Sequence, residues 1–183
     1  CTGLTSVIIS DNVTSIGRSA FAGCTGILSL TISNSVQNIE DGAFSGCGSI
    51  TNITVANSNP KYHSSGNCLI ETKSKTLILG SNSSVIPNDG SVTSIGDSAF
   101  AGCVGLKSIT IPISVKSIGR CAFEGCTGIT SITIPNSVTD IGNWAFSDWT
   151  SSQTIYYWGT KKYSWHTYGW EYDCNAKIIW GTT

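Results

Sequence analysis

The residues with the most chemical potential in this sequence are its eight cysteines and two histidines. Five of the cysteines are separated by 23, 23, 56 and 23 residues, at Cys1, Cys24, Cys47, Cys103 and Cys126. No two cysteines have the C-x-x-C spacing that is typical of zinc sites, and His63 and His166 lie far apart in the chain. The sequence therefore predicts no metal site and no cofactor.

Catalysis usually requires several unlike reactive groups in one pocket. Neither histidine stands in a recognisable nucleophile motif, and there is no G-x-S-x-G or phosphate-loop pattern. The carboxylates at Glu40, Asp41, Asp140 and Asp148 fall in predicted turns, where such side chains usually face solvent or bond to the backbone. We therefore expect a protein without enzymatic activity.

The shared position of the five regularly spaced cysteines has two interpretations. A free cysteine behaves as a small buried hydrophobe, so a ladder of thiols one strand spacing apart suits a packed core. A disulfide framework is the alternative, and the sequence leaves the redox state of Cys68, Cys121 and Cys174 open. We expect the ladder to consist of buried free thiols.

Aligned on these cysteines, the chain is a repeat. One copy, "CTGLTSVIISDNVTSIGRSAFAG", begins at Cys1, and another, "CTGITSITIPNSVTDIGNWAFSD", begins at Cys126. A fixed period of about 20 to 50 residues is typical of solenoids, in which each coil buries its apolar face only against its neighbours. The sequence therefore predicts a repeat solenoid.

Each unit predicts the path of one coil. Val7 and Ile9 recur with a period of two, which suits a strand with one buried face. The step that ends in Ala20 and Phe21 is too short for a stable helix, so we expect a turn or a single 3₁₀ step there. Stacked coils would place all five phenylalanines in one column: Phe21, Phe44, Phe100, Phe123 and Phe146.

The recurring pattern L-x-S-I-T-I-P-x-S-V-x-x-I-G-x-x-A-F-x-G-C resembles the treponemal, or BspA-like, class of leucine-rich repeats over about residues 1–149. This resemblance implies a right-handed, curved solenoid of short parallel strands, a secreted or cell-surface location and, frequently, adhesion. Glu40 departs from the pattern, because the other units have glycine there: Gly17, Gly96, Gly119 and Gly142.

Residues 47–102 form one enlarged coil of the predicted solenoid. "NSNPKYHSSG" at 57–66 has the composition of a loop, whereas "NCLIE" and "TLILG" flank "TKSK" as a β-hairpin would. The insertion is similar to a long variant coil of the same family. It either keeps the stack continuous or forms a binding protrusion.

The C-terminal end is rich in aromatic residues, and all six tryptophans lie from Trp144 onward. Each earlier coil is followed by a cysteine, and Trp149 takes that position after the last coil. A large ring there would cover the open end of the core. We therefore expect residues 150–183, which resemble the terminal piece of BspA-like proteins, to cap a solenoid of residues 1–149. A glycan-binding platform is the alternative, because exposed rings stack on pyranose faces; its candidates are Trp158, Tyr163, Trp165, Tyr168 and Trp170.

The residues that alternate with the buried strand positions are expected to point outward: Ser6, Ser29, Thr31, Asn52, Thr54, Ser108, Thr110, Ser131 and Thr133. In horseshoe-shaped repeats this concave face most often contacts ligands. Its hydroxyl groups suit an extracellular protein or a glycan, whereas a solvated, threonine-rich face is the structural alternative. A purely structural spacer is therefore the competing function.

Charge limits the classes of partner. Charged residues make up 11% of the chain, the net charge is −1, and no Lys/Arg cluster occurs. Nucleic acids and anionic membranes are bound through concentrated positive charge, so we expect neither as a partner. No run of eighteen apolar residues predicts insertion into a membrane.

The remaining expectations concern the context of the chain. By family resemblance we expect a module that is secreted or lies at the cell surface, and we expect it to be monomeric. Because residue 1 is not Met and lies inside a repeat, we expect the chain to be part of a longer protein. Sequons at Asn12, Asn52 and Asn82 leave N-glycosylation open.

Overall fold

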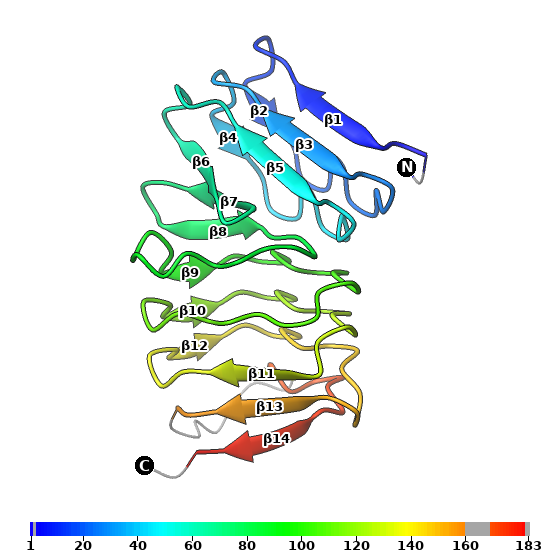
Figure 1. The fold of residues 1–183 in the computed structure, drawn as a ribbon, viewed down its shortest axis with the longest axis vertical. Helices are drawn as coiled ribbons and strands as arrows, with labels where there is room; N and C mark the ends of the chain where they lie inside the picture. The colour runs from blue at the N-terminus through cyan, green and yellow to red at the C-terminus, as the bar shows by residue number, and fades with distance from the viewer. Residues whose placement is uncertain (2, 160–168, 182–183) are drawn as a thin grey trace.

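The computed structural model describes residues 1, 3–159 and 169–181, which form an elongated stack of coils (Figure 1). These residues contain fourteen short strands and no helix. The N-terminus lies near one end of the stack and the C-terminus lies at the other (Figure 1). The predicted repeat solenoid is confirmed.

One side of the stack carries two parallel sheets. Three strands pair near the N-terminus: β1 (Ser6–Ile9), β3 (Ser29–Ile32) and β5 (Asn52–Val55). Three more pair near the C-terminus: β11 (Ser131–Ile134), β13 (Thr154–Tyr157) and β14 (Lys177–Trp180). The strand face is our name for the outward surface of these six strands together with residues 108–111, the corresponding segment of the coil before β11.

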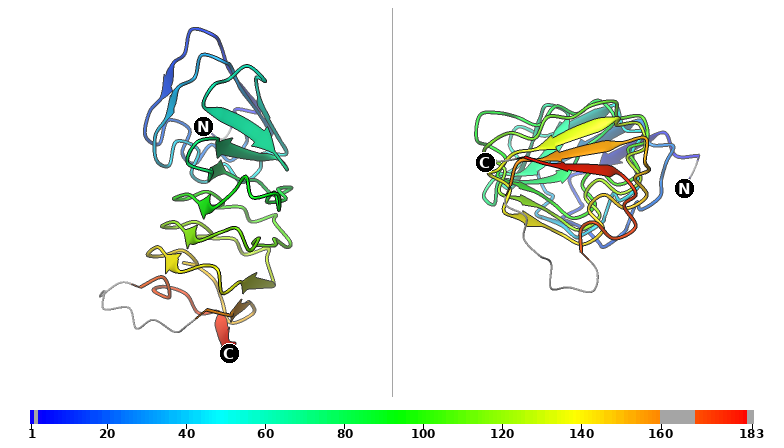
Figure 2. Two further views of the ribbon diagram at one scale, coloured as in Figure 1. Left: turned by 90° about the vertical axis from the view of Figure 1, so that its left-hand side faces the viewer. Right: turned by 90° about the horizontal axis from the view of Figure 1, so that it is seen from below.

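Another side of the stack carries the remaining strands (Figure 2). Six of them form one sheet, in the order β12 (Asp140–Ile141), β10 (Ser117–Ile118), β9 (Ser94–Ile95), β8 (Thr76–Leu79), β7 (Cys68–Glu71) and β6 (Tyr62–Ser65). A separate parallel pair consists of β2 (Ser15–Ile16) and β4 (Asn38–Ile39).

Side chains alternate between core and solvent along the strand face. In β1, Val7 and Ile9 are buried, while Ser6 and Ile8 are exposed, because successive side chains of a strand point to opposite sides. Residues 108–111 keep this alternation, but no backbone hydrogen bond joins them to β11. The predicted strand is therefore unpaired there, and β10 holds the coils together by pairing with both β9 and β12.

The prediction of one phenylalanine column is wrong, because the column is broken. Phe21 and Phe44 stack with ring centroids 5.3 Å apart. A second stack has spacings of 5.1 and 5.5 Å and contains Phe100, Phe123 and Phe146. Between the two stacks the Gly80 backbone lies against the ring of Phe100, so closely that a Cβ on Gly80 would be 2.0 Å from Cε1. Gly80 occupies the position of a phenylalanine, and the buried core divides into two clusters.

The enlarged coil contains three antiparallel strands. The predicted hairpin of β7 and β8 is confirmed, with a bulge near Leu69 and Ile70. The loop predicted at 57–66 is wrong for residues 62–65, which form β6 and pair with β7. Gly66 and Asn67 connect them, both with φ of 56°, which is typical of two-residue hairpin turns. Since β8 pairs in parallel with β9, the enlarged coil belongs to the stack.

Candidate binding surfaces

The structure orients the nine predicted contact residues away from the core. Seven are exposed, while Ser29 and Thr31 are half-buried. Parallel pairing aligns them in two rows, since Ser6, Ser29 and Asn52 are partners in register, as are Ile8, Thr31 and Thr54. The rows resume in β11, while Ser108 and Thr110 lie on the unpaired segment between the two sheets.

The same rows continue beyond the residues that sequence reasoning selected. Thr154 and Lys177 follow Ser131 in register, and Tyr156 and Ile179 follow Thr133. The 23-residue period could have identified the next residue of each row, because Tyr156 lies 23 residues after Thr133. Lys177 is the only charged residue of the six strands, so the strand face is otherwise neutral.

The side chain of Asn67 closes the edge of β5. Its Oδ1 accepts the Ile53 N–H at 2.7 Å, and its Nδ2 donates to the Thr51 carbonyl at 3.0 Å. A residue of a neighbouring parallel strand makes the same two bonds with its backbone, so the amide replaces a peptide group. The Asn67 amide also lies 2.7 Å from the hydroxyl oxygens of Ser81 and Ser83.

Other polar residues of the enlarged coil also bond to the stack. The Asn59 amide donates to the carbonyls of Ser33 and Val36, at 2.7 and 3.1 Å. The Tyr62 hydroxyl accepts the Ile39 N–H at 3.0 Å. These contacts join the insertion to the preceding coils, which favours a continuous stack over a protrusion.

A pocket of about 240 Å³ lies where the phenylalanine column is broken, between residues 39–45 and the segments 76–79 and 96–98. Two of its rim carboxylates bond to neighbouring coils. Glu40 accepts the Arg18 N–H at 2.9 Å, and Asp97 accepts the Arg120 N–H at 2.7 Å. Glu40, the departure from the glycine pattern, therefore helps to hold two coils together.

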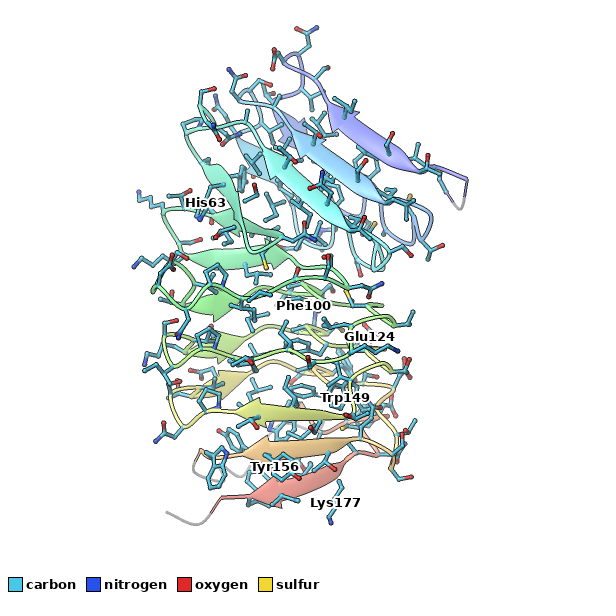
Figure 3. The ribbon with its side chains drawn as sticks, viewed as in Figure 1. His63, Phe100, Glu124, Trp149, Tyr156 and Lys177 are labelled. Carbon is cyan, nitrogen blue, oxygen red and sulfur yellow. The ribbon has the colours of Figure 1, made fainter. Side chains whose placement is uncertain are left out.

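Trp149 is completely buried and closes the core (Figure 3). Its ring packs edge-on against Phe146 at 5.2 Å, and its Nε1 donates to the Phe123 carbonyl at 2.8 Å. The thiols of the repeat make the same contact, since Cys126 Sγ donates to the Phe100 carbonyl at 3.1 Å. Trp149 thus takes both the position and the hydrogen bond of a cysteine.

The structure describes two of the five rings of the predicted glycan platform, Trp158 and Trp170. Tyr163, Trp165 and Tyr168 lie outside the described residues. Trp170 is half-buried and packs edge-on against three rings: Phe146, Tyr157 and Trp180. Packing at the end of the core accounts for Trp170, whereas Trp158 is 49% exposed.

Four members of the predicted thiol ladder are buried, at Cys24, Cys47, Cys103 and Cys126. The prediction is wrong for Cys1, which is exposed because no coil of this chain precedes it in the stack, and all eight cysteines are free. Burial raises the pKa of Cys47 and that of Cys68 to about 11. Burial raises the pKa of Cys103 to about 12. These three thiols are therefore protonated and poorly nucleophilic at neutral pH.

We expect the free energy of unfolding to fall as the pH rises from about 9 to 11. The unfolded thiols ionise near their ordinary pKa of 9.0, whereas folded Cys47, Cys68 and Cys103 stay protonated. The stabilisation is complete below pH 9 and is lost at about 1.4 kcal/mol per pH unit for each thiol. Urea unfolding at several pH values measures this. Cys103→Ala should make the fall shallower; an identical pH dependence in that variant would contradict the assignment.

Two further classes of site can be assessed for the residues that the structure covers. Among them, no three His, Cys, Asp or Glu side chains gather as a metal site would require. In the same residues, no helix has the length and apolar character needed to cross a bilayer.

Comparison with solved structures reveals related folds. A leucine-rich repeat protein from Eubacterium ventriosum is 23% identical with a TM-score of 0.67, over 87% of this chain and 55% of that protein. A leucine rich cell surface protein from Faecalibacterium prausnitzii is 24% identical with a TM-score of 0.62, over 100% and 61%. The pneumococcal vaccine antigen PcpA is 15% identical with a TM-score of 0.60, over 98% and 58%. The chain thus spans less than two thirds of the length of each.

No curated protein matches the sequence. The family model described as the BspA type leucine rich repeat region, in contrast, matches six copies within residues 1–89 and 80–167. The repeat spacing, the parallel strand register and this match agree over most of the chain. The chain belongs to the BspA-type leucine-rich repeat family.

Proposed function

We propose that the chain is a non-enzymatic binding module of an extracellular or cell-surface protein, and that its strand face contacts a host or matrix protein. The outward rows of Ser and Thr carry this proposal, because they present repeated hydrogen-bonding groups on a nearly uncharged surface. The relatives named as a cell surface protein and as a vaccine antigen support an exposed location.

The shape of the strand face favours a macromolecule. Four residues of a strand span about 13 Å, and neighbouring strands lie about 4.8 Å apart, so six strands and the segment between them make a surface more than twice as long as it is wide. Ile8, which is 76% exposed, adds an apolar contact to the hydroxyl rows. Many weak polar contacts with a few apolar ones are typical of protein interfaces.

We expect the double variant Thr54→Lys/Thr110→Lys to weaken protein binding by at least about tenfold, because it places two uncompensated charges on the neutral face. Surface plasmon resonance against a panel of matrix and host-surface proteins measures the affinity. Thr14→Lys/Gln37→Lys is the matched control, since it adds the same charge at exposed residues just before β2 and β4. Equal loss in both variants would contradict the strand face as the contact surface, and no binding to any protein of the panel would favour the spacer.

A further inference from the structure

We propose that Tyr156 and Trp158 form a binding subsite for a neutral pyranose of a glycan at the C-terminal end of the strand face. Figure 3 shows Tyr156 on β13. The two residues break the pattern of the outward rows, because the preceding coil has Thr133 and Pro135 at the same positions. This subsite does not depend on the protein-binding role of the Ser and Thr rows.

Both rings point away from the core. Ile155 and Tyr157 are buried, so the alternation of the strand directs Tyr156 and Trp158 outward, where they are 37% and 49% exposed. Neither ring contacts another ring within the described residues, whereas the neighbouring Tyr157 packs on Trp170 and Trp180. Core packing therefore does not explain these two aromatic residues.

The backbone holds the Trp158 ring in place before any ligand binds. The ring lies against Gly181, where a Cβ would be 2.2 Å from Trp158 Cε3. The Gly181 N–H donates to the Tyr157 carbonyl at 2.8 Å, which fixes the glycine beside the ring. A ring that is already positioned loses little conformational freedom when a ligand stacks on it.

The residues beside the rings supply the polar part of a sugar site. Thr133 is the register partner of Tyr156, and Thr154 lies two residues before Tyr156 on the same side of the strand. The C–H face of a pyranose can stack on an aromatic ring while its hydroxyls bond to Thr side chains. The one charged residue of these strands, Lys177, is the register partner of Thr154, whereas the register partners of Tyr156 are the neutral Thr133 and Ile179, which favours a neutral sugar.

A protein partner is the other class of ligand that exposed rings could contact. Aromatic residues that dominate protein interfaces usually lie near the centre, where surrounding contacts exclude water. Tyr156 lies instead on β13, the next-to-last strand of the strand face, and Trp158 directly follows that strand. Their position therefore favours a sugar that needs only a small open surface.

Isothermal titration of the chain with neutral oligosaccharides of glucose, galactose and N-acetylglucosamine tests this proposal. We expect saturable binding to at least one series, weakened by at least about tenfold in Trp158→Ala and in Tyr156→Thr, which restores the residue of the preceding coil. Gly181→Ala should weaken it as well, because the new methyl group displaces a ring that is otherwise retained. Ile8→Thr at the far end of the face should leave it unchanged.

Three results would overturn the proposal. They are no saturable binding at about ten-millimolar sugar, equal binding by all variants, and loss of a protein partner in Trp158→Ala with no sugar bound by the parent chain. Thermal unfolding of each variant checks that the fold is intact. Sugar binding should persist in Thr54→Lys/Thr110→Lys, so a failure of this proposal is distinguishable from a failure of the protein-binding role.

Discussion

Replacing Trp149 by Ala is expected to lower the free energy of unfolding by about 3–5 kcal/mol. The Trp149 side chain is completely buried, packs on Phe146 and satisfies the carbonyl of Phe123 through its Nε1. Its removal would leave a cavity, and the Phe123 carbonyl would keep only the hydrogen bond from the Cys126 N–H at 3.2 Å. Urea unfolding followed by circular dichroism measures the change, provided that the transition remains cooperative.

Two conservative variants separate the contributions of Trp149. Trp149→Phe retains most of the ring volume but removes the Nε1 donor, and we expect a loss of about 1–3 kcal/mol. Trp149→Cys restores the residue of the repeat and a thiol donor, and should be intermediate between the Phe and Ala variants. A change below about 1 kcal/mol for Trp149→Ala would contradict its role in closing the core.

The effect of Trp149→Ala should be local, because the stability of a solenoid is approximately a sum over neighbouring coils. Amide hydrogen exchange should accelerate in β11, β13 and β14, the strands of the C-terminal coils. Exchange in β1 and β3 should change little, since these strands belong to the other core cluster. Uniform acceleration along the chain would show that the two clusters unfold as one unit.

The second large effect is expected for Asn67→Asp, which should lower the free energy of unfolding by about 2–4 kcal/mol. The change preserves the size of the side chain and its tolerance of positive φ. It removes the Nδ2 donor and places a carboxylate oxygen beside the Thr51 carbonyl, which now accepts a hydrogen bond at 3.0 Å. The edge of β5 would lose the group that replaces a neighbouring strand.

Asn57→Asp is the matched control for Asn67→Asp, because Asn57 is exposed and belongs to the same enlarged coil. It adds the same charge and should change the free energy of unfolding by no more than about 0.5 kcal/mol. Equal effects of the two variants would show that the added charge, rather than the lost amide donor, is responsible.

The sequence period predicted the regular coils well, because each coil contacts mainly its neighbours and repeats their packing. It could not predict that Gly80 occupies the position of a phenylalanine, since the period places Gly80 at the level of Cys103, three residues after the phenylalanine position. The loop-like composition of residues 57–66 also led us to miss β6, although the Gly66–Asn67 pair is typical of a hairpin turn.

The candidate binding surfaces were predictable in part. Alternation within each strand sufficed to identify Thr54 or Thr133 as outward, because one face of the sheet must be buried. Tyr156 was missed because the repeat alignment ended at Trp149, although the register of the coils continues through β13 and β14. The role of the Asn67 amide depends on a contact with residues 51 and 53 that no local pattern encodes.

Hydroxyl-radical footprinting of the chain, alone and with a protein of the panel that binds it, tests the role of the strand face most directly. The chain offers two matched pairs, since Ile8 and Ile113 are both 76% exposed, while Tyr156 and Tyr172 are 37% and 43% exposed. Only Ile8 and Tyr156 lie on the strand face. We predict that the partner reduces oxidation of Ile8 or Tyr156 and leaves Ile113 and Tyr172 unchanged. Protection of Ile113 or Tyr172 with neither strand-face residue protected would contradict the strand face as the binding surface.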